Sequence, residues 1–63
     1  MKIIRVKFYK SETDKSGNNK QQFLGFVDVL GNDLPDGCSY LARAFRVCNN
    51  DQKNSNAVTV EEL

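Results

Sequence analysis

The two cysteines and the absence of histidine are the first sequence features that bear on catalysis and metal binding. The 63-residue chain contains no histidine, so the side chain that most often serves as a general acid or base near neutral pH is absent. Cys38 and Cys48 would each need a neighbouring base to act as nucleophiles, and two thiols without histidine are too few ligands for a zinc site. We therefore expect reduced thiols that fill apolar space, and no metal or cofactor.

The carboxylates offer no clear catalytic pair either. Asp33 and Asp36 lie in a segment rich in turn residues, whereas Glu61 and Glu62 are consecutive and would point to opposite faces of a strand. The glycine-containing turn dipeptides lack the spacing of a phosphate-binding loop. A chain this short buries only about 60% of the surface that it exposes when unfolded, which leaves little room for a walled substrate pocket. The sequence predicts a single domain over residues 1–63 that is not an enzyme.

Charge is balanced overall but unevenly placed. The net charge is +1 and the isoelectric point is about 7.8, below the strongly basic range expected of a dedicated nucleic-acid binder. Residues 1–20 hold six basic and two acidic residues, which gives +4, whereas residues 21–63 hold three basic and six acidic residues, which gives −3. The pattern predicts a positive and a negative side. No apolar run reaches the length of a membrane span, and the N-terminus does not resemble a signal peptide, so we expect a cytoplasmic protein.

Two segments have the period-two alternation of half-buried strands, residues 1–10 and residues 21–30. Residues 11–20 contain no apolar side chain and are predicted to form a long hairpin loop. In the second strand Asp28 should point outward, because an unpaired carboxylate is costly to bury. This arrangement places Leu24 and Phe26 on the outer face as well. Gly25 leaves the register open, because a glycine within a strand often marks a bulge.

The only predicted helix covers residues 38–49, with apolar side chains along one stripe. Asp36 is the candidate N-cap, and a start at Asp33 and Pro35 is the competing interpretation. Ten residues of continuous helix would separate Cys38 and Cys48 by about 15 Å, too far for a disulfide. Residues 51–56 are predicted to form a polar loop, and residues 57–63 a short final strand.

These elements predict an α+β fold in the order strand, strand, helix, strand (ββαβ). The hairpin and the crossover place the last strand beside the first, so we expect a three-stranded antiparallel sheet of order 2-1-3 with one helix on one face. The predicted core is apolar and draws on all four elements: Ile4, Val6, Phe8, Phe23, Val27, Val29, Leu41, Phe45, Val58 and Val60.

One helix leaves the second face of such a sheet open, and here that face is mixed rather than polar. The predicted partner-binding side chains on it are aromatic, aliphatic and basic: Arg5, Lys7, Tyr9, Leu24 and Phe26. A contiguous exposed apolar group of this kind favours a contact surface, unless a register shift or a loop covers part of it. A second candidate surface lies on the outer side of the helix, where Tyr40, Arg43 and Val47 follow i, i+3, i+7 spacing with Arg46 alongside.

Two partner classes fit the open face. Tyrosine and arginine around an apolar centre are typical of protein–protein hot spots, and aromatic side chains flanked by cations also stack single-stranded nucleic acid. The near-neutral charge favours a protein partner, so a module that binds single-stranded nucleic acid is the alternative. A homodimer formed through the open face or an edge strand is a third hypothesis.

The chain also resembles the small accessory proteins of T-even-like tailed phages. The resemblance lies in an N-terminal strand (MKIIRVKFYK), a helix of the kind in SYLARAFRVC and a short acidic end (VTVEEL) in a tiny Lys/Asn-rich chain. It implies a cytosolic, non-catalytic antagonist that binds a host protein, such as a defence, toxin, transcription or nucleic-acid-processing factor. No site residue carries over from that group, because no motif matches position by position.

Overall fold

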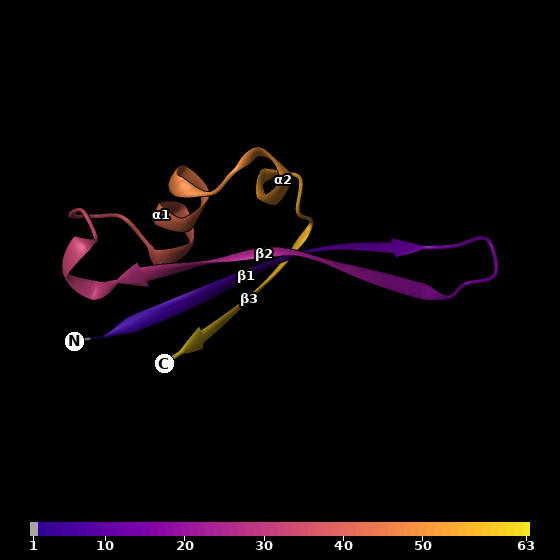
Figure 1. Ribbon diagram of the computed structural model, residues 1–63, viewed down its shortest axis with the longest axis horizontal. Helices are drawn as coiled ribbons and strands as arrows, with labels where there is room; N and C mark the ends of the chain where they lie inside the picture. Colours follow the sequence, from indigo (N-terminus) through magenta and orange to yellow (C-terminus); the bar gives the residue numbers. More distant parts are fainter. Residues whose placement is uncertain (1) are drawn as a thin grey trace.

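The computed structural model describes residues 2–63. Over these residues the chain forms three strands, β1 (Ile3–Thr13), β2 (Asn19–Leu30) and β3 (Ala57–Glu62). They make one antiparallel sheet of order β2-β1-β3 (Figure 1). The predicted α+β class, the strand order and the antiparallel pairing are confirmed.

The helical segments follow β2 and lie on one side of the sheet (Figure 1). A 3-10 turn (Gly31–Asp33) leads to α1 (Tyr40–Val47), which is shorter than the predicted 38–49. The predicted N-cap at Asp36 or Asp33 is wrong, because α1 begins after Ser39, whose hydroxyl accepts a hydrogen bond from the Ala42 N–H at 3.1 Å. Within residues 2–63, none of the helices is long and apolar enough to cross a membrane.

A second helix, α2 (Asn50–Lys53), occupies the stretch predicted to be a polar loop. It is held by a capping box: the Asn49 side chain accepts from the Gln52 N–H at 2.9 Å, and the Gln52 side chain accepts from the Asn49 N–H at 3.1 Å. The capping residues, rather than an apolar stripe, explain why so short a helix forms.

The core is smaller than the predicted one. Its fully or nearly buried apolar residues are Ile4, Val6, Phe8, Val29, Ala44 and Cys48. Phe45 packs edge-on against Phe8, with ring centroids 5.2 Å apart. Four predicted core residues are exposed at the surface instead, namely Phe23, Leu41, Phe45 and Val60. An eight-residue helix is about 12 Å long, and α1 packs mainly over β1 and β2, so the sheet is only partly covered.

The β2 strand contains a bulge at Leu24 and Gly25, as the glycine suggested. Phe8 pairs with Gly25 and Tyr9 pairs with Phe23, so Leu24 is the extra residue. Gly25 has a φ of +129°, which L side chains rarely adopt. A β-carbon there would also overlap the side-chain amide of Gln52. The bulge moves Phe23 to the side of the sheet without helices and Leu24 to the helix side.

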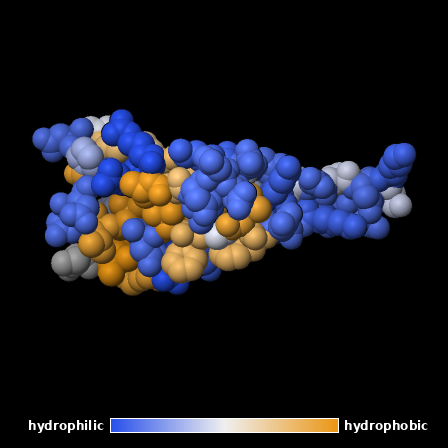
Figure 2. Space-filling model, turned by 45° about the horizontal axis from the view of Figure 1, so that its top comes forward, coloured by the Kyte–Doolittle hydropathy of each residue, from blue (hydrophilic) through white to orange (hydrophobic). Residues whose placement is uncertain are grey.

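Beyond the body, β1 and β2 continue as a two-stranded arm, which gives the molecule extents of 45 × 22 × 17 Å (Figure 1). The predicted loop over 11–20 is therefore shortened to residues 14–18. The Asp14 side chain organises this turn, because its Oδ1 accepts from the N–H groups of Ser16 and Asn18 at 2.9 Å each. Figure 2 shows polar side chains over the arm and apolar ones gathered on the broad end with the helices.

Asn56, which directly precedes β3, is the last residue to pair with β1 in the direction of the arm. Its backbone N–H donates to the Tyr9 carbonyl at 3.0 Å. Its side-chain amide then accepts from the Ser11 N–H at 2.7 Å and donates to the Ser11 carbonyl at 2.9 Å. The Asn56 side chain thus satisfies the backbone N–H and carbonyl of Ser11, with which a further residue of β3 would otherwise pair.

Candidate binding face

The side of the sheet turned away from α1 and α2 is called the outer face here. The pairing registers assign these side chains to it: Ile3, Arg5, Lys7 and Tyr9 of β1, Phe23, Phe26, Asp28 and Leu30 of β2, and Ala57, Thr59 and Glu61 of β3. Both helices lie on the opposite side (Figure 1), so no helix of residues 2–63 covers the outer face.

Two phenylalanines of the outer face are large exposed apolar side chains. Phe23 is 53% exposed and Phe26 is 48% exposed. Tyr9 lies across the ladder from Phe23, with ring centroids 5.4 Å apart and the rings tilted by 55°. Each ring stands on a strand held by ladder hydrogen bonds, so the rings present rigid apolar area to a partner at little entropic cost.

Arg5 lies between an aromatic ring and a carboxylate. Its guanidinium is 4.3 Å from the centroid of the Phe26 ring. It also donates two hydrogen bonds to Asp28, from Nε at 2.8 Å and from Nη2 at 3.0 Å. These hydrogen bonds lower the pKa of Asp28 below its usual value and raise that of Arg5. The fork geometry and the ring contact fix the guanidinium in one orientation.

The second cation of the outer face is also paired. Lys7 Nζ lies 3.3 Å from Glu61 Oε1 on β3. Arg5 and Lys7 are therefore each matched by one carboxylate, and these four groups sum to zero charge. Such partly exposed pairs add little stability, but they remove the positive field that phosphate groups would need.

The structure brings together four of the five residues predicted for this face, namely Arg5, Lys7, Tyr9 and Phe26. The placement of Leu24 on it is wrong, because the bulge turns Leu24 to the helix side, where it packs against the core. Phe23 takes its place. The sequence signal for this exchange is Gly25 itself, since a bulge at that glycine reverses the facing of every residue that precedes it.

Of the four residues predicted on the outer side of the helix, two share a surface in the structure. Tyr40 is partly buried and packs against the core, so only part of its side chain is available for contact. Arg43 and Val47 lie beside β2, where they help to line a depression of about 210 Å³ next to Asp28. Arg46 is exposed. Arg43 and Val47 thus lie together on the β2 side of α1, whereas Tyr40 packs against the core.

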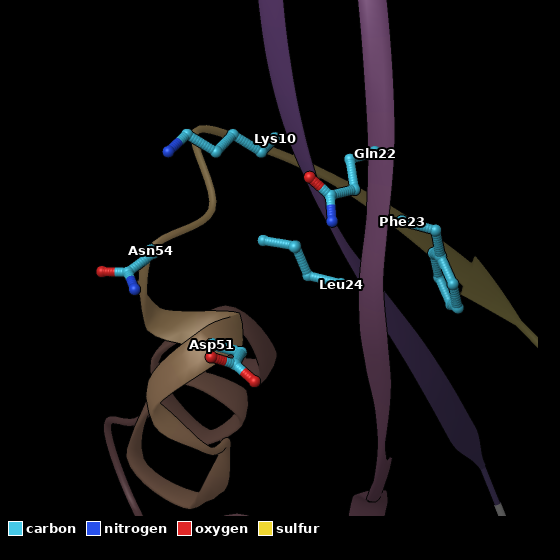
Figure 3. A pocket seen from close by; sticks show the side chains of 6 residues that line it. All are labelled: Lys10, Gln22, Phe23, Leu24, Asp51 and Asn54. Carbon is cyan, nitrogen blue, oxygen red and sulfur yellow. The ribbon is translucent and has the colours of Figure 1, made fainter.

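A larger cleft lies between α2 and the base of the arm and has a volume of about 410 Å³. Figure 3 shows Gln22 and Leu24 pointing into it from β2, Asp51 and Asn54 bordering it, and Phe23 pointing to the other side of the strand. The sequence did not indicate this cleft, because α2 forms one of its walls and was not predicted. It is open and bordered by amide and charged groups, which suits contact with a partner's polar side chains.

Acidification is expected to weaken the Arg5–Asp28 pair. Because the folded-state pKa of Asp28 is lowered, its stabilising contribution is complete above the unfolded-state pKa of about 4 and is lost as the pH falls through the folded-state value. Arg5→Met should flatten the decline of thermal stability over that acid range. The exposed loop variant Lys15→Met is the control and should retain the wild-type slope. Equal slopes for Arg5→Met and wild type would contradict this role of the pair.

Comparison with protein-family models, curated proteins and solved structures finds no match to this chain.

Proposed function

We propose that this protein is a non-catalytic binding protein of the cytosol that modulates another protein through its outer face. The observation that supports this most is the uncovered group of Tyr9, Phe23 and Phe26 with the fixed guanidinium of Arg5. Exposed aromatic side chains that form a contiguous patch mark interaction sites. Tyrosine and arginine at the centre of a patch are also the residues most enriched in hot spots.

The balanced charge of the outer face favours a protein surface over nucleic acid. Arg5 and Lys7 are engaged by Asp28 and Glu61, so binding phosphates there would require breaking two ion pairs. A protein partner with an apolar centre and a polar rim needs no such change. Stacking of single-stranded nucleic acid on the rings is the alternative function, since bases stack on aromatic side chains of open sheets.

The resemblance to accessory proteins of T-even-like phages supports inhibition of the partner rather than activation. The proposed partner is a bacterial host protein, and the proposed outcome is inhibition by occupying a surface that the host protein needs. A small rigid sheet with exposed rings is suited to that role, because it loses little conformational entropy on binding.

The test is affinity capture from a bacterial lysate with three matched baits. Wild-type protein should retain one host protein in a stoichiometric amount. The outer-face bait Tyr9→Ala/Phe26→Ala should lose it, because both changes remove exposed ring area. The helix-side bait Arg43→Ala/Val47→Ala should retain it.

Two results would overturn the proposal. Equal capture by the wild-type and outer-face baits would place the contact elsewhere, and loss only with the helix-side bait would place it beside α1. A parallel titration with mixed-sequence oligonucleotides at low salt tests the alternative. Binding there that falls steeply with salt would favour the nucleic-acid function.

A further inference from the structure

The odd-numbered residues of β1 turn their backbone N–H and carbonyl groups toward β3. The carbonyls of Ile3 and Tyr9 each accept a hydrogen bond at 3.0 Å, from the N–H groups of Leu63 and Asn56 at the two ends of β3. Backbone groups alternate in direction along a strand, so the odd-numbered residues between Ile3 and Tyr9 also face β3. The groups of these residues are therefore turned away from β2.

This orientation leaves backbone groups of β2 without partners. Phe26 and Asp28 lie opposite Lys7 and Arg5, and opposite residues of an antiparallel ladder exchange either both hydrogen bonds or neither. The N–H and carbonyl groups of Phe26 and Asp28 thus point to the free edge of the sheet, since β2 is an edge strand. Among residues 2–63, no backbone hydrogen bond outside the ladder involves either residue. Both residues are exposed, so the four groups form a template for another extended chain.

A groove follows this edge and has α1 as its second wall. The depression of about 210 Å³ is bordered by Asp28 and Leu30, whose side chains lie on the outer face, and by Val29, whose side chain lies on the helix side. Because side chains of both faces border it, the depression lies at the edge of β2 rather than on either face. Arg43 and Val47 of α1 form the opposite wall. We call this depression, with the edge of Phe26–Leu30 beside it, the edge groove.

The ends of the edge groove set the length of a segment that could occupy it. At one end β2 is bulged at Leu24 and Gly25, where α2 approaches the strand through Gln52. At the other end the chain leaves the sheet in the 3-10 turn, and Figure 1 shows α1 above this end of β2. The five residues Phe26–Leu30 lie between, over about 17 Å. A partner segment of about five extended residues matches this length.

The charges of the edge groove favour an acidic side chain on the face of that segment turned to α1. Arg43 is half-buried and, within residues 2–63, takes part in no ion pair. The carboxylate of Asp28 is already held by Arg5 through two hydrogen bonds, and Asp33 lies in the 3-10 turn at one end. Val47 adds an apolar contact to the same wall. An acidic side chain with apolar neighbours two residues away is the complementary pattern.

We propose that the edge groove binds an extended, acidic peptide segment of another protein, which joins the sheet as a fourth strand between β2 and α1. Main-chain hydrogen bonds to Phe26 and Asp28 supply affinity, and the α1 wall selects the side chains. A second copy of this chain fits less well, because symmetric pairing along Phe26–Leu30 places Asp28 opposite Asp28 of the other copy. The edge groove is separate from the outer face, so this inference does not rest on the proposed function.

Hydrogen exchange measured by NMR during a peptide titration tests the site. The probe is the blocked peptide TVTETVT, which as a strand carries valine and glutamate on one face. The N–H groups of Phe26 and Asp28 should exchange rapidly in the free protein. They should exchange about tenfold more slowly when the peptide concentration is about ten times its Kd. The blocked peptide TVTKTVT should bind about fivefold more weakly, the effect of an exposed ion pair.

A matched pair of variants tests the α1 wall. Arg43→Glu should reverse the preference, so that TVTKTVT binds more tightly than TVTETVT. Arg46→Glu changes the other arginine of α1, which is exposed and does not border the edge groove, and should keep the wild-type preference. Circular dichroism checks the fold of both variants. A preference that survives Arg43→Glu, or that is reversed by Arg46→Glu, would contradict this role of Arg43.

N-methylated peptides test the backbone pairing separately. One form of TVTETVT is methylated on the threonine nitrogens, and the other on the valine and glutamate nitrogens. Alternate N–H groups of an added strand face β2 while the others face solvent, so only one of the two forms should bind.

Three results would overturn the proposal. The first is unchanged exchange of Phe26 and Asp28 with TVTETVT at concentrations up to about 10 mM, which covers weak association. The second is equal binding of the two methylated forms. The third is a free protein in which these N–H groups are already protected and sedimentation velocity shows a dimer, which would assign the edge to a second copy.

Discussion

Phe23→Ala is expected to lower the affinity for the captured protein partner about 30-fold, the size of a hot-spot contribution of about 2 kcal/mol. The ring is more than half exposed and packs against Tyr9 on its own face. Removing it should therefore lower the free energy of unfolding by only about 1 kcal/mol, the value of an aromatic pair. Calorimetric titration with the purified partner and urea unfolding of the free variant measure the two quantities.

The neighbouring residue supplies the control. Leu24→Ala removes a side chain that the bulge turns to the helix side against the core. It should lower the free energy of unfolding by roughly 1–3 kcal/mol, because truncation leaves a partial cavity, and leave the affinity nearly unchanged. Truncation of Phe23 should thus mainly lower the affinity, whereas truncation of Leu24 should mainly lower the free energy of unfolding. A loss of affinity with Leu24→Ala that equals the loss with Phe23→Ala would mean that the facing of these side chains is not what the bulge predicts.

Gly25→Ala is expected to be the most destabilising single-methyl change in the chain. Two effects add at this position. A φ of +129° is strained for alanine, and the new β-carbon overlaps the amide of Gln52, which must then leave its capping box. Together they should lower the free energy of unfolding by about 2–4 kcal/mol. That is a large fraction of the stability expected for a domain of this size.

Gly37→Ala separates the two effects, because Gly37 has a φ of +75° but nothing within 4 Å of a β-carbon. It should lose only the backbone contribution, about 1 kcal/mol. Urea unfolding of both variants gives the comparison. Equal losses for Gly25→Ala and Gly37→Ala would show that Gln52 does not press on the bulge.

Much of the fold follows from local pattern in the sequence. The alternation of Ile4, Val6 and Phe8 fixes which face of β1 is buried, and the turn residues place the hairpin. Strand order then follows from a hairpin with a single crossover. The same alternation correctly assigned Arg5, Lys7 and Tyr9 to the outer face. Here the physical rule is simple, because the side-chain period of a strand is two and the register of β1 is unbroken over these residues.

The bulge, the α2 helix and the exposure of Leu41 and Val60 do not follow from the alternation of side chains along a strand. One extra residue at Leu24 exchanges the faces of Phe23 and Leu24, and periodicity alone cannot choose between a bulged and a regular strand. The α2 helix has no apolar stripe and is stabilised by the reciprocal caps of Asn49 and Gln52. Leu41 and Val60 remain exposed because α1 is too short to cover the third strand, which is a property of packing between elements.

The most direct test of the central claim is oxidative footprinting of side chains in the complex with the captured partner. Hydroxyl radicals modify exposed rings, so mass spectrometry reports protection residue by residue. If the outer face is the contact surface, oxidation of Tyr9, Phe23 and Phe26 falls strongly on binding, whereas that of Leu41 and Phe45 is unchanged. Unchanged oxidation of the three outer-face rings, or protection confined to Leu41 and Phe45, would contradict it.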